Sequence, residues 1–229
     1  MNEGDLWKSR GIIRMPSNTL IAAASNGGKT TLLIRLLLNA KHIFDHHVEH
    51  IFFCYKVDQK QYEPLKDKKN VTFIQGIPTE SDLENWHRKY SGQKICILDD
   101  LSHEMLAKEN LDFAERCFSV YGHHFQISWF WISQNLFTKN MRHISLNSHF
   151  IIVLKYNRDM NQIITLARQI FPTKINSFLK AYEDAIKSSE VVNQRGYVII
   201  DCHAATKTSD MRMYTNVTPQ EYPMIGYVI

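Results

Sequence analysis

The sequence lacks the features of several large protein classes. No stretch approaches the ~20 apolar residues that a membrane helix needs; the best candidates, residues 19–24 and 150–154, have the length of strands. Residues 1–10 carry mixed charges and no apolar run, which is not the pattern of a secretory signal. We therefore expect a chain that neither enters a membrane nor is exported.

Cysteine is scarce and scattered. The four cysteines are Cys54, Cys96, Cys117 and Cys202, and no two of them have CxxC spacing. This argues against a zinc site and against a disulfide framework. The eleven histidines come closest to metal-ligand spacing in residues 42–50, which we interpret as a solvated connection between a helix and a strand.

Neither positive nor negative charge is present in large excess. The 229 residues include 27 basic and 23 acidic side chains, a formal net charge of +4 that excludes a histone-like polycation. Residues 136–180, however, hold seven basic residues against one acidic residue, a net +6 that leaves −2 for the rest. The seven are Lys139, Arg142, Lys155, Arg158, Arg168, Lys174 and Lys180. Either an anionic partner meets this segment or it forms a solvated basic face.

What the chain does have is an alternation of apolar runs and helical patterns. With 44% apolar residues, it is long enough to bury a core. Strands are predicted at residues 18–23, 50–55, 71–75, 94–98, 127–133 and 149–155, with late strands at 196–201 and near Tyr214. Helices are predicted at 29–40, from a capping box at 81–84 to near Gly92, and at 110–121, 160–170 and 174–187. This alternation favours an α/β fold, a mostly parallel central sheet flanked by helices. Without a repeat or a linker, we expect residues 1–229 to form a single domain.

A phosphate-binding loop of the Walker A kind follows the first predicted strand and opens the first helix. Its expected nucleotide-binding residues are Ser25, Asn26, Gly27, Gly28, Lys29, Thr30 and Thr31. The two glycines allow backbone N–H groups to face a phosphate. Lys29 is suited to contact the β- and γ-phosphates of ATP, and the Thr30 hydroxyl to ligate Mg²⁺. Ala23 stands where such loops usually have their first glycine, a mild variation. The alternative is an ordinary strand-to-helix turn.

Two adjacent carboxylates end the apolar run at residues 95–98. Successive strand residues point to opposite sides, so Asp99 and Asp100 need not do the same work. We assign Asp99 to the Mg²⁺ side and Asp100 to orienting or activating the attacking water. In the alternative interpretation, one aspartate caps the turn that follows.

A third polar element follows residues 127–133. The Gln134 amide is suited to touch the γ-phosphate or to hold the lytic water, or else it satisfies a loop. Arg142 and Arg158 flank the next predicted strand. Either arginine is a candidate for a finger that reaches across a subunit boundary, or for a surface salt bridge.

Together these motifs resemble those of the FtsK/HerA superfamily of P-loop motors and, more closely, the genome-packaging ATPases of poxviruses, Polintons and adintoviruses. The resemblance spans residues 18–223, which leaves residues 1–17 as an N-terminal extension. It rests on the segments 25–30, 97–101, 122–124, 132–137, 142–148, 157–159, 166–170 and 181–185. The blocks Gln-Asn-Leu-Phe at 134–137 and Leu-Asn-Ser at 146–148 are far more specific than the phosphate loop. The chain departs from these relatives at Ala23 and at the pair Phe125-Gln126, which puts a DNA role for that turn in doubt.

The resemblance implies a P-loop NTPase of the RecA/FtsK-like, additional-strand kind. It implies a homo-oligomeric ring, usually a hexamer, that hydrolyses ATP with Mg²⁺ to drive double-stranded DNA into a viral capsid. Capsid proteins would then be partners, no membrane would be involved, and the protein would act in the virion or where virions assemble in the nucleus or cytoplasm of the host cell. The resemblance also implies roles for five residues that match the family's site residues: Lys29 and Thr30, the acidic pair Asp99 and Asp100, and Gln134 as the sensor.

Two other functions stay open at this point. A small P-loop kinase acting on a nucleotide or a metabolite would share the phosphate loop. Such kinases usually lack paired acids at the end of a strand together with a separate amide. A non-catalytic nucleotide-binding scaffold would have no need of Lys29, Thr30, Asp99, Asp100 and Gln134 together.

Overall fold

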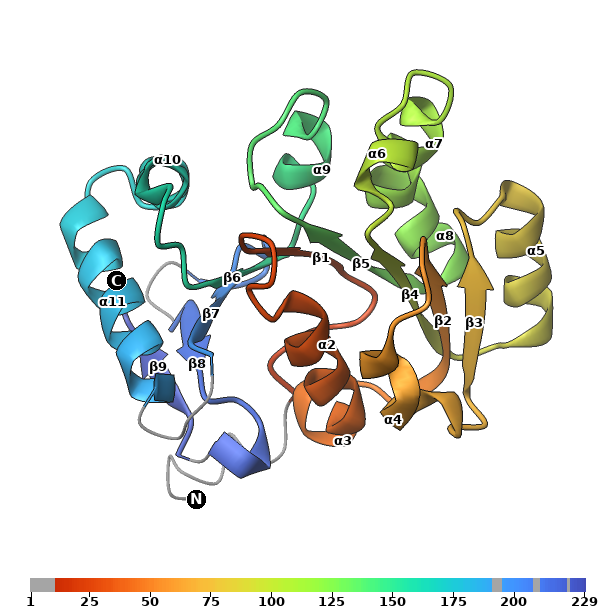
Figure 1. The fold of residues 1–229 in the computed structure, drawn as a ribbon, viewed down its shortest axis with the longest axis horizontal. Coiled ribbons are helices and arrows are strands. Elements are labelled where there is room, and N and C mark those ends of the chain that lie inside the picture. The colour runs from red at the N-terminus through yellow and green to blue at the C-terminus, as the bar shows by residue number, and fades with distance from the viewer. Residues whose placement is uncertain (1–10, 191–194, 208–210, 222) are drawn as a thin grey trace.

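A nine-stranded sheet forms the centre of the fold in the computed structural model (Figure 1). The structure describes residues 11–190, 195–207, 211–221 and 223–229, so most of the expected N-terminal extension lies outside the described residues. The strands are β1 (Asn18–Ala22), β2 (Val48–Tyr55), β3 (Val71–Gln75), β4 (Gln93–Asp99), β5 (Ile127–Ser133), β6 (Phe150–Leu154), β7 (Tyr197–Asp201), β8 (Met213–Thr215) and β9 (Ile225–Tyr227).

The sheet order is β3-β2-β4-β5-β1-β6-β7-β8-β9. The first six strands along the chain pair in parallel, and β7, β8 and β9 are antiparallel to their neighbours. Strand β5 lies between β1 and β4, so it separates the strand before the phosphate loop from the strand that carries the paired acids. This inserted strand is the feature expected of the additional-strand class.

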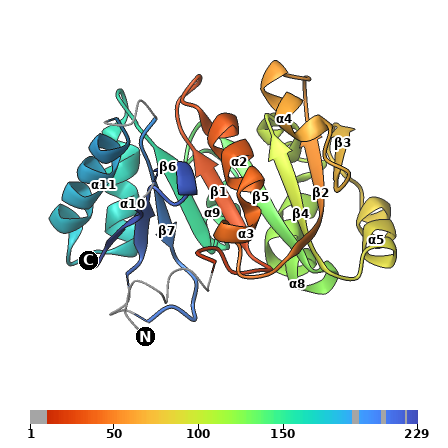
Figure 2. The ribbon, with the colours of Figure 1, turned by 90° about the horizontal axis from the view of Figure 1, so that it is seen from below.

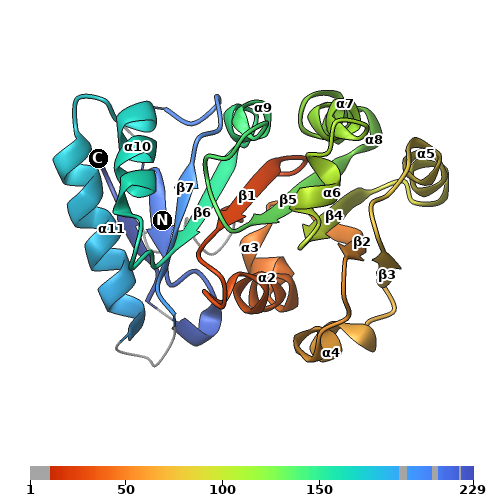
Figure 3. The ribbon, with the colours of Figure 1, turned by 45° about the horizontal axis from the view of Figure 1, so that its top comes forward.

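Helices cover both faces of the sheet (Figures 2 and 3). One face carries α2 (Lys29–Leu38), α3 (Ala40–Ile43) and α4 (Glu63–Lys66), with the 3₁₀ turn η1 (Lys60–Tyr62) before α4. The other face carries α5 (Glu80–Lys89), α6 (Ser102–Met105), α7 (Leu111–Arg116), α8 (Gly122–Phe125), α9 (Arg142–Leu146), α10 (Met160–Ile170) and α11 (Ile175–Glu190). In the described part of the chain, none of these helices has the length and apolar character to cross a membrane.

Strand β5 shows why the predicted strands read as unbroken apolar runs. Trp129 and Trp131 pack into the core beneath α7, α8 and α9, while Phe130 and Ile132 pack into the core beneath α2. All four side chains are buried because a covered parallel sheet has no solvent face. The resulting mostly parallel, helix-flanked sheet confirms the fold class expected from the sequence.

Several boundaries differ from the sequence-based expectation. The predicted helix at 29–40 is interrupted at Asn39, where α2 gives way to α3. The predicted helix at 110–121 becomes α7 and then the π-helical segment η2 (Cys117–Tyr121). The capping box of α5 is formed by Thr79 and Asp82, not by residues 81–84. Thr79 has the extended backbone of an N-cap, so the helix begins two residues earlier than expected.

Candidate nucleotide-binding site

The carboxyl ends of β1, β4 and β5 meet at one edge of the sheet. In the strand register, Ala22 lies opposite Ser133, and Leu98 lies opposite Trp131. The loops that follow these strands surround a cleft of about 850 Å³. Its lining includes residues 25–31, Asp99, Asp100 and Gln134, which brings together the predicted phosphate loop, acidic pair and amide.

The phosphate loop has the backbone geometry that such a loop requires. Asn26 and Gly28 both adopt left-handed conformations, with φ of 58° and 89°. A side chain at Gly28 would be strained by that φ alone. A Cβ at Gly27 would stand 2.7 Å from the Cβ of Ala23. Ala23 therefore fills the space beneath Gly27, and a small side chain at position 23 is compatible with the loop.

Lys29 lies across its own loop. Its Nζ donates to the carbonyl oxygens of Ala23 and Ala24, at 2.8 and 2.9 Å. Burial lowers the pKa of Lys29, and the nearby carboxylates of Asp99 and Asp100 oppose that shift. The ammonium group is thus held at the cleft between the loop and the acidic pair, where an anionic group would meet it.

Thr30 and Asp99 connect the loop to the acidic strand. The Thr30 hydroxyl donates to Oδ2 of Asp99 at 3.0 Å, and both residues are buried. Burial raises the pKa of Asp99, while hydrogen bonds from Thr30 and Tyr62 and the charge of Lys29 lower it. A hydroxyl and a carboxylate placed this way are oxygen ligands of the kind that Mg²⁺ takes.

Asp100 has a different environment from its neighbour. It is exposed, has a φ of 57° and lines the cleft beside the loop. The left-handed backbone at this residue turns the chain out of β4, so the two adjacent carboxylates differ in burial and in partners. The separate roles assigned to the two carboxylates stay a prediction.

Gln134 follows β5 directly, and its exposed side chain lines the cleft. The Tyr156 hydroxyl donates to the Gln134 carbonyl at 3.2 Å. Gln162 accepts from the backbone N–H of Leu136 at 2.7 Å and donates to Oδ1 of Asn135 at 3.1 Å. The backbone around Gln134 is therefore held by Tyr156, which follows β6, and by Gln162 of α10.

Arg142 and Arg158 do not join this group. Both are exposed, Arg142 at the start of α9 and Arg158 after β6, and neither lines the cleft. Their assignment as fingers that act on a neighbouring subunit stays a prediction.

The structure adds an arginine that sequence reasoning missed. Arg195, just before β7, donates from Nη1 to the carbonyl of Asn26, and its methylene chain lies over Gly28. It is exposed and lines the cleft. No motif surrounds Arg195 in the sequence, and only the pairing of β7 with β6 brings it to the phosphate loop.

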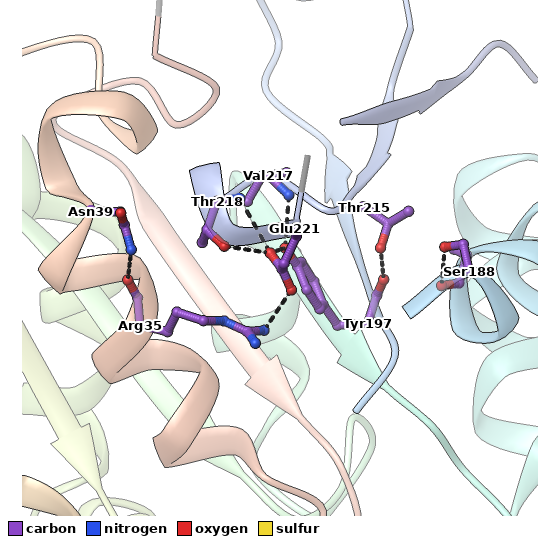
Figure 4. A network of polar contacts seen from close by, with 9 residues as sticks. Arg35, Asn39, Ser188, Tyr197, Thr215, Val217, Thr218 and Glu221 are labelled. Atoms are coloured by element: carbon purple, nitrogen blue, oxygen red, sulfur yellow. Dashed lines mark hydrogen bonds and ion pairs between the residues drawn. The ribbon is translucent and has the colours of Figure 1, made fainter. Parts of the chain in front are cut away.

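Two further residues that line the cleft, Lys56 and Arg35, were also not identified from the sequence. Lys56, which directly follows β2, lies with its Nζ 2.7 Å from Oε1 of Glu104. Arg35, on the helix that the phosphate loop opens, lies with Nη2 2.8 Å from the fully buried Glu221. Figure 4 shows this contact and the Tyr197 hydroxyl, which donates to the same carboxylate at 2.7 Å. Helix α2 is thereby tied to the C-terminal strands.

Comparison with known structures places this site in a recognised fold. The chain is similar to the genome packaging NTPase B204 from Sulfolobus turreted icosahedral virus 2. In complex with AMPPCP, that structure gives a TM-score of 0.52 at 14% identity, covering 83% of this chain and 94% of B204. The complex with AMP gives 0.50 at 14% identity, covering 81% and 92%. No family model matches the sequence, and neither does any curated protein. The chain thus has the P-loop NTPase fold of a viral packaging NTPase, and the resemblance stated from the sequence is confirmed at the level of the fold.

Proposed function

We propose that this chain is a Mg²⁺-dependent ATPase of the genome-packaging type, which couples ATP hydrolysis to the movement of double-stranded DNA. The observation that carries the proposal is the meeting of Lys29, Thr30, Asp99 and Gln134 in one cleft at the ends of β1, β4 and β5. The fold shared with the packaging NTPase B204, solved with AMP, ATPγS and AMPPCP, supports it.

Each of the cleft residues has its own role in the proposed hydrolysis. The loop amides at the start of α2 bind the phosphates, and Lys29 balances the charge of the β- and γ-phosphates. Asp100, exposed to the cleft, orients the attacking water and accepts its proton. Gln134 holds the water or the γ-phosphate in line, which lowers the entropic part of the barrier.

Thr30 and Asp99 are the residues that would hold Mg²⁺. Their contact at 3.0 Å places a hydroxyl and a carboxylate together beside the phosphate loop, so the donor set fits the ion. When bound, Mg²⁺ neutralises charge on the β- and γ-phosphate oxygens. Arg195 adds a further positive group to the same cleft from its own subunit.

The basic segment at residues 136–180 is the proposed contact with DNA or with a neighbouring subunit. All seven of its basic residues are exposed, as an electrostatic contact requires. In a homo-oligomeric ring, Arg142 or Arg158 would complete the ATP site of the next subunit. A hexamer that threads DNA into a capsid, in the virion or at the site of virus assembly, is the arrangement we propose.

An ATPase assay with and without double-stranded DNA, on a size-fractionated sample, tests this function. We expect Mg²⁺-dependent hydrolysis that DNA stimulates in the oligomeric fraction, with a response that weakens as salt rises. The Lys29→Ala variant, which lacks the phosphate-binding ammonium, should be inactive. Equal hydrolysis with and without DNA at every salt concentration would contradict translocation. ATP consumption that depends on an added nucleotide or metabolite would indicate the kinase alternative.

A further inference from the structure

Tyr62 contributes a second hydrogen bond to the carboxylate that faces the phosphate loop. Its hydroxyl donates to Oδ2 of Asp99 at 3.0 Å, and the same oxygen accepts from Thr30 at 3.0 Å. Tyr62 lies in the η1 turn between β2 and β3, 37 positions before Asp99. Two donors from separate segments of the chain therefore converge on one oxygen atom.

The tyrosine is held rigidly from two directions. Its ring is fully buried among Phe53, Tyr55 and Phe73, with ring-centroid distances of 4.7, 5.7 and 5.9 Å. One residue earlier, Gln61 accepts from the Thr31 hydroxyl at 3.2 Å, which fastens the η1 turn to α2. The position of the Tyr62 hydroxyl is thus fixed both by the aromatic cluster and by the helix that the phosphate loop opens.

We propose that Tyr62 is a positioning residue that holds the Asp99 carboxylate in the orientation needed to receive Mg²⁺-bound nucleotide. The terminal torsion of an aspartate is broad, so one hydrogen bond leaves its carboxylate free to rotate. Thr30 is itself a proposed ligand, so its hydroxyl serves both the ion and the Asp99 carboxylate. Tyr62 is outside the proposed ligand set, so it supplies the anchor that does not move. Outer partners of this kind orient metal ligands in proteins.

The competing explanation is that Tyr62 serves the core alone. Tyr62→Phe separates the two explanations, because it keeps the ring in the cluster and removes only the hydroxyl. Tyr55→Phe is the matched control. Tyr55 pairs with Asp99 through the backbones of β2 and β4, but its hydroxyl, unlike that of Tyr62, makes no hydrogen bond to the Asp99 carboxylate. If core packing were the whole role, both variants would leave nucleotide binding as it is.

The experiment measures the affinity of ATPγS by equilibrium binding, once with Mg²⁺ and once with EDTA. For Tyr62→Phe we expect unchanged affinity in EDTA and a loss of roughly 10- to 100-fold with Mg²⁺, the range for partners of metal ligands. Tyr55→Phe should match the wild type in both conditions. In an Asp99→Asn background, adding Tyr62→Phe should have little further effect, because the two residues act through one contact.

Three results would overturn the inference. One is a Tyr62→Phe variant with the wild-type gain in affinity from Mg²⁺. The second is an equal loss of affinity with and without the metal, which indicates a general disturbance of the cleft. The third is a variant that does not fold, which assigns Tyr62 to the core. The inference rests on the proposed ATPase, and the outcomes separate the two: a wild-type protein with no affinity for Mg²⁺-ATPγS contradicts the ATPase itself.

Discussion

Arg35 and Glu221 form an ion pair between the phosphate-loop helix and the C-terminal part of the chain, with 2.8 Å between Nη2 and Oε1. The Glu221 side chain has no exposed surface, and that of Arg35 retains 23%. The guanidinium also lies over the Tyr197 ring, 5.7 Å from its centroid. Removing one member of such a pair leaves the other charge without compensation, so this contact should matter for stability more than a surface ion pair does.

We therefore expect Glu221→Gln to lower the free energy of unfolding. Losing one partner of a fully buried pair costs about 3–5 kcal/mol, and the partial exposure of Arg35 should place the loss at or below the lower end. Glu63→Gln is the control, because Glu63 pairs with Lys66 at the surface, where a pair is worth ~0–1 kcal/mol. Urea denaturation measures both. Equal losses in the two variants would show that the buried pair contributes no more to the free energy of unfolding than the surface pair does.

Asp100→Asn should separate binding from turnover. The amide keeps the size of the side chain but cannot accept a proton from water, so ATP should bind with wild-type affinity while hydrolysis slows by about 10²–10⁴-fold. Single-turnover kinetics and nucleotide binding, measured on the same preparation, check this. Asp67→Asn, at an exposed position between α4 and β3, is the matched control. Unchanged turnover in Asp100→Asn would remove Asp100 from the role of water activation.

Arg142→Ala and Arg158→Ala test for an arginine that acts on the neighbouring subunit. Loss of such a finger should slow hydrolysis by roughly 10³–10⁵-fold. Mixing the variant with Lys29→Ala subunits should restore partial activity, because the inactive subunit lends its intact arginine to a neighbour with an intact phosphate loop.

Arg195→Ala supplies the contrast for this mixing experiment. Arg195 contacts the phosphate loop of its own chain, so an intact Arg195 on a Lys29→Ala neighbour cannot replace it. Mixing should therefore leave the Arg195→Ala variant as slow as before. If neither Arg142→Ala nor Arg158→Ala recovers on mixing, both arginines lose the proposed role in trans.

The lowered pKa of His149 predicts that the free energy of unfolding depends on pH. Burial, with smaller contributions from His203 and His123, lowers its pKa from 6.5 to about 4. The unfolded chain therefore binds a proton at this residue between about pH 6.5 and pH 4 while the folded chain does not. The free energy of unfolding should fall as pH drops through that window, and the contribution is absent above it.

The His149→Gln variant isolates this contribution. Its free energy of unfolding should depend less steeply on pH between 6.5 and 4 than that of the wild type. His46→Gln is the control, since His46 is exposed. Denaturation at a series of pH values gives the slopes, and parallel slopes for wild type and His149→Gln would contradict the prediction.

The sequence predicted those features of the fold and site that depend on neighbouring residues better than those that depend on residues far apart in the chain. Segments such as 71–75, 127–133 and 160–170 were located correctly because their patterns are local, and the phosphate loop was recognised because its geometry is set by consecutive residues. The α5 cap was misplaced since Thr79-Glu80-Ser81-Asp82 and Ser81-Asp82-Leu83-Glu84 both fit the capping pattern.

Three residues in and around the cleft that the sequence did not identify share a different property. Tyr62, Arg195 and Glu221 become meaningful only through contacts with residues 37, 169 and 186 positions away, and no short pattern surrounds them. A tyrosine in a polar stretch or an arginine before a strand reads as an ordinary surface residue until the sheet order is known.

The position of the antiparallel strands late in the chain affects the order in which the parts of the cleft form during synthesis. Arg195 and Glu221 contact the phosphate loop and its helix, but they are made 169 and 186 residues after their partners Asn26 and Arg35. Domains form as units during synthesis, and contacts between distant segments are slow to assemble. A growing chain would thus carry an incomplete cleft until the segments that hold Arg195 and Glu221 have been made and have joined the sheet.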